Sequence, residues 1–202
     1  PALEKPGDRD DIPLAALHDR PNQRKLTVEQ KREIIQAYYA STTLMDACLG
    51  RVLDALDDIK LTDNTIVVFV SDHGYHLGHK GLWQKSDLFE GSARVPMIVS
   101  GPGMKNAGQS TASLAELVDL YPTLSELCNL PRPAHLKGQS LVRVLNEPEV
   151  TVREAAFTVT RIRKRMPGQK GRDRLLGHTI RTKRYRYTEW ADRKPVSYTH
   201  LT

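Results

Sequence analysis

The sequence predicts an α/β fold with a small antiparallel sheet towards its C-terminal end. A helical pattern over about Val28 to Ile59 leads directly into a short apolar run, Ile66 to Val70, and that order is typical of α/β domains. After about Pro148 the apolar residues alternate with period two, which favours strands with one solvated face. The 202 residues, 39% of them hydrophobic and 27% charged, can bury a sizeable core.

The first regular element expected is a long amphipathic helix. Pro1 to Lys25 is rich in Pro, Asp and Arg without periodicity, and is expected to be irregular. Thr27 followed by Gln30 fits a capping box at the start of the helix. Apolar residues then recur at helical spacing: Met45, Leu49, Val52, Leu56 and Ile59. The pattern leaves open a break near Ser41 to Thr43.

The strand Ile66 to Val70 ends on "SDHG", which makes Asp72 and His73 candidate site residues. Its continuous β-branched and aromatic run is expected of a central strand covered on both faces. In open α/β sheets, ligands gather beyond the carboxyl ends of the strands. Adjacent strand residues point to opposite faces, so both can bind one ion only where the backbone turns, a freedom that Gly74 supplies. The four residues alone leave open a metal site or a cap with a surface residue.

The remaining elements follow from local patterns. "RVPMIVSGPG", from Arg94 to Gly103, predicts a second apolar strand with a Gly-Pro-Gly stop. "DLYPTLSELCNLP" predicts a helix capped by Asp119. "AAFTVTRIR" and "HTIRTKRYRYTEW" predict antiparallel strands, the second stretch turning at Lys183 and Arg184.

The net charge of +6 favours anionic partners, and much of the excess lies in one segment, Arg161 to Arg174. That segment has no interleaved aromatic residues, so a solvated surface is expected and nucleic-acid binding is not. No apolar stretch reaches the roughly 18 residues of a membrane span. Cys48 and Cys128 are too few and too far apart for a disulfide framework or a cysteine zinc site.

Long ordered motifs carry a resemblance to a known family. They are "AYYASTTLMDACLGRVLDALDDIKLTDNTIVVFVSDHGYHLGHKGLWQKSDLFEGSARVPMIVSGPG", "ELVDLYPTLSELCNLPRP", "LKGQSLVRVL" and "HTIRTKRYRYTEW". Over about Asp10 to Lys194 the chain resembles the C-terminal half of sulfatases of the alkaline phosphatase superfamily, nearest to the iduronate-2-sulfatase-like branch. The resemblance implies part of a three-layer α/β/α sandwich over residues 1–148 and part of a small antiparallel subdomain over residues 149–195.

The resemblance also implies hydrolysis of sulfate esters, on a small ester or a sulfated glycan such as a glycosaminoglycan. It maps ligands of a bound Ca²⁺ onto Asp72 and His73, and contact with the sulfate onto Lys85. A hard divalent cation and a lysine can stabilise the charge that develops on sulfuryl oxygens. The compartment it suggests is periplasmic, extracellular or lysosome-like; the oligomeric state is not indicated.

Two alternatives stay open. Calcium prefers oxygen ligands, and an imidazole favours Zn²⁺ or Mn²⁺, as in phosphate-cleaving relatives. With Zn²⁺ or Mn²⁺ as the bound ion, the chain would belong to a phosphodiesterase or phosphonate hydrolase of the same superfamily. A third reading is a non-catalytic binder of sulfated glycans that uses Arg161 to Arg174.

The nucleophile of the family, a formylglycine made in the motif C/S-x-P-x-R, has no counterpart in the 202 residues. Cys128, in "CNLPR", has its Pro one residue late and is expected to be a core residue. The nucleophile, two further aspartates and a proton-donating histidine are therefore expected upstream of Pro1, and the chain alone is expected to be inactive. "VSYTHL" matches a sequencing-adapter translation, so residues 196–202 are expected to be an artefact and the chain a fragment cut at both ends.

The other polar and aromatic residues after the strand have no role transferred to them. His76, His79 and Lys80 are expected to line the mouth of a pocket or to lie in a solvated loop. Trp83 and Phe89 are expected to be packing residues.

Overall fold

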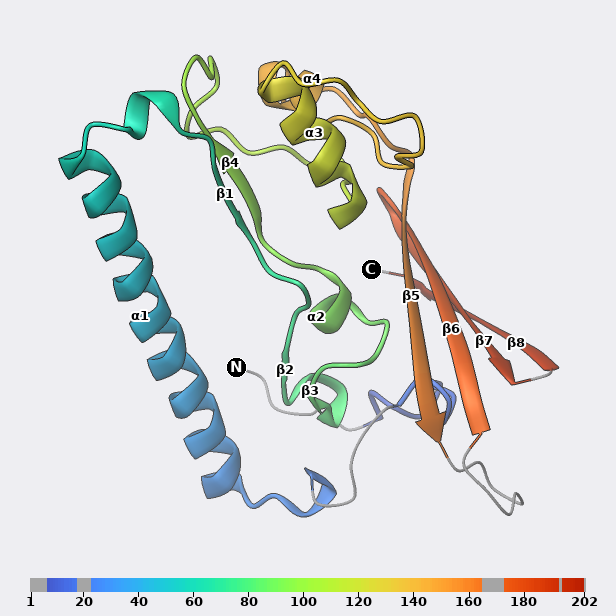
Figure 1. Cartoon of the computed structure of the whole chain (residues 1–202). Coiled ribbons are helices and arrows are strands. Elements are labelled where there is room, and N and C mark those ends of the chain that lie inside the picture. Colours follow the sequence, from blue (N-terminus) through green and yellow to red (C-terminus); the bar gives the residue numbers. More distant parts are fainter. Residues whose placement is uncertain (1–6, 18–22, 165–172, 193, 202) are drawn as a thin grey trace. The chain divides into compact units, whose positions relative to one another are not determined.

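The computed structural model describes residues 7–17, 23–164, 173–192 and 194–201 (Figure 1). The chain divides into two compact units, Pro1–Pro102 (unit 1) and Gly103–Thr202 (unit 2). The boundaries predicted near residues 148 and 195 stay predictions, as does the artefact at residues 196–202. No helix in the described ranges is long and apolar enough to cross a membrane.

Unit 1 consists of one long helix, short strands and short helical turns. In chain order they are η1 (Gln23–Lys25), α1 (Val28–Asp58), η2 (Thr62–Asn64), β1 (Val67–Val70), β2 (His76–Leu77), η3 (His79–Gly81), β3 (Trp83–Gln84), α2 (Glu90–Ala93) and β4 (Met97–Ser100). β1 pairs with β4 and β2 with β3, both antiparallel. The two predicted strands are therefore present, each shorter than its apolar run.

Helix α1 begins as predicted and continues without a break (Figure 1). The Thr27 hydroxyl accepts from the amide of Gln30, and the Gln30 side chain accepts from the amide of Thr27. Ser41, Thr42 and Thr43 donate their hydroxyls to the carbonyls four residues earlier, at 2.9–3.0 Å. These hydroxyls are thus satisfied within the helix, which continues through Ser41 to Thr43.

The expected burial of the central strand is wrong for this chain. Among the described residues β1 pairs with β4 alone, and its side chains are partly exposed, Val70 by 36%. None of the side chains of α1 is buried, and Leu44 and Val52 of that helix are 67% and 65% exposed. A β-branched run predicts a strand, but it does not predict whether the same chain also supplies the layers that cover that strand.

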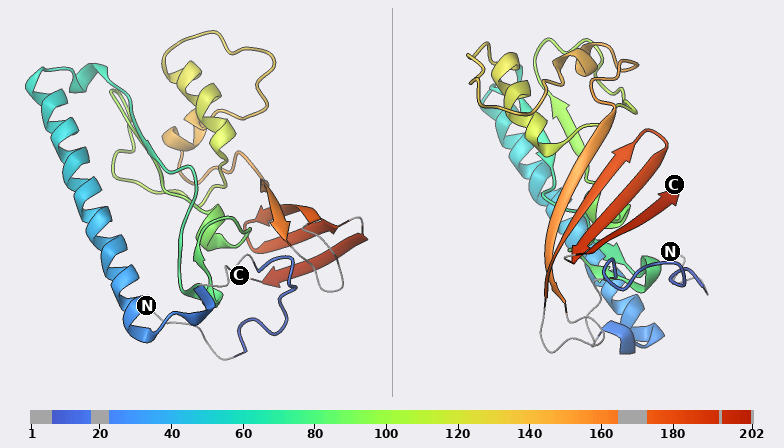
Figure 2. Two further views of the ribbon diagram at one scale, coloured as in Figure 1. Left: turned by 60° about the horizontal axis from the view of Figure 1, so that its bottom comes forward. Right: turned by 90° about the vertical axis from the view of Figure 1, so that its right-hand side faces the viewer.

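Unit 2 holds short helices followed by a four-stranded meander (Figure 2). Its elements are η4 (Leu117–Asp119), α3 (Leu120–Leu127), α4 (Val142–Asn146), β5 (Ala155–Lys164), β6 (Asp173–Thr182), β7 (Tyr185–Asp192) and β8 (Lys194–Leu201). The strands pair antiparallel in the order β5-β6-β7-β8, and β6 turns into β7 at the predicted Lys183 and Arg184. The small antiparallel sheet is thus confirmed.

The sheet of unit 2 has the two unlike faces that period-two alternation predicts. Ile162, Leu175 and Trp190 are 3%, 0% and 1% exposed. On β5 the alternate residues Phe157 and Val159 are 60% and 58% exposed. One face therefore forms the core of this unit, while the other stays accessible.

Asp119 does not cap helix α3 with its side chain, contrary to the sequence prediction. Its carboxylate is fully buried and accepts from the amides of Glu116 and Gln139, at 2.9 and 2.7 Å, and from the guanidinium of Arg153. Arg153 also pairs with Glu116, at 2.7 Å. The carboxylate joins three segments of unit 2 that are far apart in sequence.

Candidate functional site

The backbone turns immediately after β1, as the sequence predicts, but Gly74 is required for a different reason. The amide of Gly74 donates to the carbonyl of Ser92 at 2.8 Å. A Cβ at position 74 would meet the carbonyl oxygen of Gly91 far inside van der Waals contact. Close approach of two backbone segments, rather than left-handed backbone, therefore excludes a side chain there.

Asp72 and His73 lie side by side at the carboxyl end of β1. Oδ2 of Asp72 is 3.6 Å from Nε2 of His73, and their side chains are 84% and 34% exposed. Nδ1 of His73 is 2.8 Å from the carbonyl oxygen of Gly74. A carbonyl only accepts, so Nδ1 carries the proton and Nε2 presents a lone pair. That lone pair lies on the side of the ring near the carboxylate of Asp72.

Lys85 reaches the same place from the end of β3. Its Nζ is 2.5 Å from Nε2 of His73, to which it donates. Lys85 stands between two non-glycine residues in left-handed backbone, Gln84 with φ 79° and Ser86 with φ 86°. Such backbone costs on the order of 1–3 kcal/mol per residue and is common at functional sites. The three residues singled out from the sequence are thus brought together within a few ångströms.

The donors present fit part of a divalent metal site. Asp72 offers carboxylate oxygens and His73 an imidazole lone pair oriented by its bond to Gly74, the arrangement typical of metal-ligating histidines. Searched over the described residues, the chain has no cluster of three or more His, Cys, Asp or Glu that could hold an ion. Since Ca²⁺ takes six to eight ligands, these two side chains would supply only a fraction of its coordination.

His76 is neither at a pocket mouth nor in solvated chain, so both sequence interpretations of it are wrong. Its side chain is 1% exposed, and Nε2 lies 3.1 Å from Oδ1 of Asp87, which is 3% exposed. The partners stand eleven residues apart, and neither spacing nor periodicity signals the pair. The antiparallel pairing of β2 with β3 places His76 opposite Gln84, shortly before Asp87.

The remaining residues near the turn have packing and anchoring contacts. Trp83 is 5% exposed, which confirms the packing prediction. Lys80 forms an ion pair with Asp8 at 3.1 Å and lies 5.7 Å from the ring centroid of Phe89. Lys80 therefore fastens the N-terminal segment of the chain to η3.

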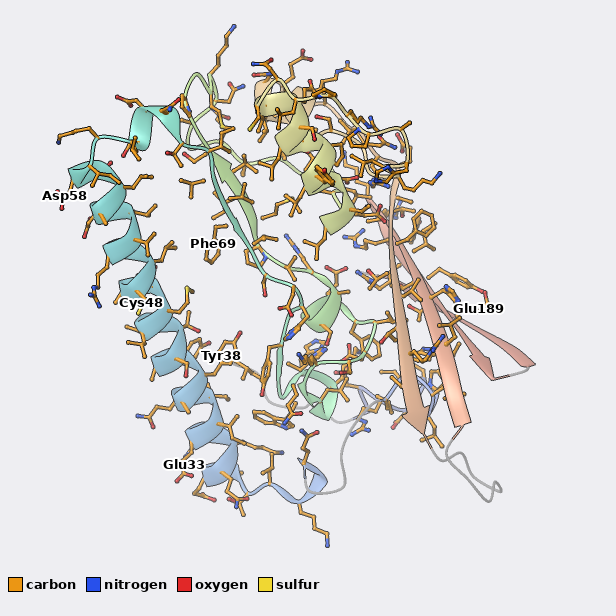
Figure 3. The ribbon with its side chains drawn as sticks, in the orientation of Figure 1. Glu33, Tyr38, Cys48, Asp58, Phe69 and Glu189 are labelled. Carbon is orange, nitrogen blue, oxygen red and sulfur yellow. The ribbon has the colours of Figure 1, made fainter. Side chains whose placement is uncertain are left out.

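Helix α1 contacts the site turn through aromatic stacking. The rings of Tyr38, on α1, and Tyr75, next to Gly74, have centroids 5.1 Å apart and are tilted by 31°. Figure 3 shows Tyr38 extending away from the helix axis. The contact fixes the turn that follows His73 against α1.

Replacing Gly91 with alanine is expected to lower the free energy of unfolding by roughly 1–3 kcal/mol. A Cβ there would lie 2.6 Å from Nδ1 of the buried His76 ring. Helix propensity works in the opposite direction, since Gly→Ala in an open helix gains about 1 kcal/mol. Gly50 of α1 has no atom within 4 Å of its would-be Cβ, so Gly50→Ala is the matched control and should stabilise. Urea denaturation measures both variants, and a stabilising Gly91→Ala would contradict the packing described.

Comparison with protein-family models decides the family. A model described as sulfatase matches residues 11–130, more than half of the chain. The chain belongs to the sulfatase family. A second model, the C-terminal region of N-sulphoglucosamine sulphohydrolase, matches residues 78–196 of this sulfatase-family chain.

Individual relatives agree with that assignment. The chain is 32% identical over 218 residues to an iduronate 2-sulfatase of Mus musculus, covering 83% of this chain and 40% of that protein. A solved structure of BT4656 in complex with its substrate D-glucosamine-2-N,6-O-disulfate superposes with a TM-score of 0.73 at 27% identity, covering 85% of this chain and 34% of that one. The solved phosphonate monoester hydrolase of Agrobacterium radiobacter superposes with a TM-score of 0.72 at 27% identity, covering 87% of this chain and 36% of that one.

These superpositions confirm the alkaline-phosphatase-like α/β fold that the family resemblance implied. The chain spans about two fifths or less of the length of each of these proteins. One cysteine prediction is wrong: Cys128 is exposed, because helix α3 ends at Leu127 and Cys128 is its C-cap. Cys48 is also exposed.

Proposed function

We propose that this chain carries part of the metal site and the sulfate-binding lysine of a sulfatase that hydrolyses sulfate esters. The main support is the position of Lys85, whose Nζ lies 2.5 Å from Nε2 of His73. That nitrogen is itself 3.6 Å from a carboxylate oxygen of Asp72. The ammonium group of Lys85 and two side chains that can bind a metal ion thus lie together beyond the carboxyl end of β1.

Each of these side chains has a definite task in the proposed reaction. A divalent cation bound in part by Asp72 and His73 would supply Lewis-acid stabilisation of a sulfuryl oxygen. Nε2 of His73 has one lone pair, so it accepts from Lys85 or ligates a cation, but not both at once. When Nε2 of His73 ligates a cation, Lys85 is available to donate to an anionic oxygen. Its ammonium group then stabilises the charge that grows on the sulfate as the ester bond breaks.

Calcium and a formylglycine nucleophile are part of this proposal. The carboxylate of Asp72 suits Ca²⁺, and the family resemblance favours that ion. No C/S-x-P-x-R motif occurs in the 202 residues, so the proposal places the nucleophile elsewhere in the complete gene product. Sequencing the gene upstream of Pro1 tests this directly: a C/S-x-P-x-R motif after an apolar strand is expected.

The substrate class that we propose is a sulfated glycan. One relative is named iduronate 2-sulfatase, and one solved neighbour is in complex with its substrate D-glucosamine-2-N,6-O-disulfate, so both names concern sulfated sugars. A phosphonate or phosphodiester hydrolase is the second candidate, because the similar Agrobacterium radiobacter protein is a phosphonate monoester hydrolase and an imidazole ligand suits Zn²⁺ or Mn²⁺. The binder reading that uses Arg161 to Arg174 includes residues 165–172, which lie outside the described ranges.

Assay of the complete gene product separates these candidates. It would be supplied in turn with Ca²⁺, Mn²⁺ and Zn²⁺ and tested on an aryl sulfate, on sulfated oligosaccharides and on an aryl phosphonate ester. Turnover of sulfate esters with Ca²⁺ supports the proposal. Faster turnover of the phosphonate ester with Mn²⁺ or Zn²⁺ supports the second candidate, and binding of sulfated oligosaccharides without any turnover supports a binder.

Replacing Asp72 with alanine should weaken metal binding by the complete gene product by at least the roughly 10- to 100-fold that loss of a residue supporting a metal ligand costs, because Asp72 is proposed as a ligand itself. The change removes a charged donor 3.6 Å from Nε2 of His73, and the exposed side chain makes little contribution to packing. Isothermal titration calorimetry with Ca²⁺ measures the affinity. Asp46, exposed on α1, provides the control substitution Asp46→Ala. Equal affinity of the two variants would remove Asp72 from the metal site.

A further inference from the structure

The turn that carries Lys85 does not have a relaxed backbone. Gln84 and Ser86, on either side of Lys85, have φ values of 79° and 86°, in the left-handed region that non-glycine residues rarely adopt. Backbone of this kind persists only where the surrounding structure holds it. The groups that hold this turn therefore decide where Lys85 lies.

On the N-terminal side, the turn is held by the β2–β3 pair. Gln84 is paired with His76, and the amide of Gly78 donates to the carbonyl of Leu82 at 2.9 Å. Leu82 and Trp83 are 1% and 5% exposed, so this arm is anchored by burial as well as by hydrogen bonds.

On the C-terminal side, the turn is held by the carboxylate of Asp87. Its Oδ1 accepts from the amide of Phe89 at 2.9 Å and from Nε2 of His76 at 3.1 Å. Its Oδ2 accepts from the hydroxyl of Ser92 at 2.9 Å. Because His76 is paired with Gln84, the Asp87–His76 bond closes the turn from the end of β3 to Asp87.

The same network reaches the other arm of the site. The carbonyl of Ser92 accepts from the amide of Gly74 at 2.8 Å, and Gly74 follows His73 directly. Ser92 thus donates its hydroxyl to Asp87, while its carbonyl accepts from the amide of Gly74, the residue after His73. A short series of hydrogen bonds connects the backbone beside His73 to the backbone beside Lys85, and Asp87 stands at its centre.

We propose that Asp87, together with His76 and Ser92, is the positioning centre that keeps Lys85 beside the candidate metal site. Without a cation Lys85 donates to Nε2 of His73, and when a cation takes that nitrogen Lys85 stays within reach of the bound anion. All three side chains are buried, so we expect them to act through Lys85. The inference rests on the proposed function for its effect on turnover. The effect of Asp87 on the contact between Lys85 and His73 does not depend on that function, because the bonds of Asp87 are present without any ligand.

The kinetic test is a double-mutant cycle in the complete gene product. Asp87→Asn should lower kcat/KM for an aryl sulfate by about 10- to 100-fold, since a misplacement of about 1 Å costs up to that much. In a Lys85→Ala background the same change should cost less than about threefold, because the group that it positions is already gone. His76→Gln, which keeps a donor towards Asp87, should retain more activity than His76→Leu.

The spectroscopic test does not depend on turnover. The ¹⁵N resonance of His73 Nε2, recorded at one pH without metal, should shift in Lys85→Ala because a hydrogen bond to that nitrogen is lost. Asp87→Asn should reproduce at least half of that shift. Asp119→Asn, which weakens a fully buried carboxylate network of unit 2, is the matched control and should leave the resonance in place.

The outcomes separate the two proposals. If the wild-type protein turns over no sulfate ester while Asp87→Asn shifts the His73 resonance, the proposed function fails and the positioning role stands. An unshifted resonance in Asp87→Asn, or equal losses of kcat/KM with and without Lys85, overturns the positioning role. Should Asp87→Asn not fold, Ser92→Ala, which removes one hydrogen bond from Oδ2 of Asp87, takes its place. The same two measurements then apply, the shift of the His73 resonance and the loss of kcat/KM with and without Lys85.

Discussion

Replacing Lys85 with alanine is expected to lower kcat/KM for sulfate esters by about 100- to 1,000-fold in the complete gene product. The ammonium group lies 2.5 Å from His73 Nε2, where an anion bound to a cation would be in its reach. Its charge is needed most when negative charge collects on the sulfuryl oxygens, so kcat should fall more than KM rises. Steady-state kinetics on an aryl sulfate measure both parameters.

The fold should survive this substitution, because the Lys85 side chain is exposed and packs into no core. Circular dichroism and the urea midpoint would confirm that the variant is folded. Lys105, an exposed lysine of unit 2, provides the control Lys105→Ala, which should keep wild-type kinetics. A Lys85→Ala enzyme with more than about a third of wild-type kcat/KM would exclude Lys85 from the reaction.

Local elements of this fold are readable from the sequence where one physical rule decides them. The start of α1 follows from the reciprocal bonds of Thr27 and Gln30. The C-terminal sheet follows from alternation, and its turn at Lys183 and Arg184 from the interruption of that alternation. Burial is not readable in this way, because it depends on which partner layers a chain meets, and β1 is partly exposed despite its apolar sequence.

The candidate site likewise contains residues that the sequence predicts and residues that it does not. Asp72 and His73 are found from their place at the end of a strand, a rule that depends only on chain order. Lys85 is found from the family resemblance. The bonds of Asp87 to His76 and Ser92 depend on the β2–β3 register and on two left-handed residues, which leave no local signature. Asp119 was expected to cap a helix because its sequence context matches a cap, whereas its long-range partners Gln139 and Arg153 determine its role.

Replacing Asp119 with alanine should lower the free energy of unfolding of unit 2 by about 3–5 kcal/mol. The substitution leaves the amides of Glu116 and Gln139 without their acceptor in a buried place. It also leaves the guanidinium of Arg153, only 11% exposed, with Glu116 as its remaining carboxylate in this cluster. Amide hydrogen exchange followed by mass spectrometry measures the loss separately for peptides of β5 to β7.

Two comparisons separate the buried charge from simple loss of volume. Asp119→Asn keeps an acceptor for the amides but removes the negative charge, so it should fall between wild type and Asp119→Ala. The double variant Asp119→Ala with Arg153→Ala should cost less than the sum of the single variants, because no unpaired guanidinium then stays buried. A loss below about 1 kcal/mol for Asp119→Ala, the range of exposed substitutions such as Asp46→Ala, would mean that water reaches the cluster and replaces the carboxylate.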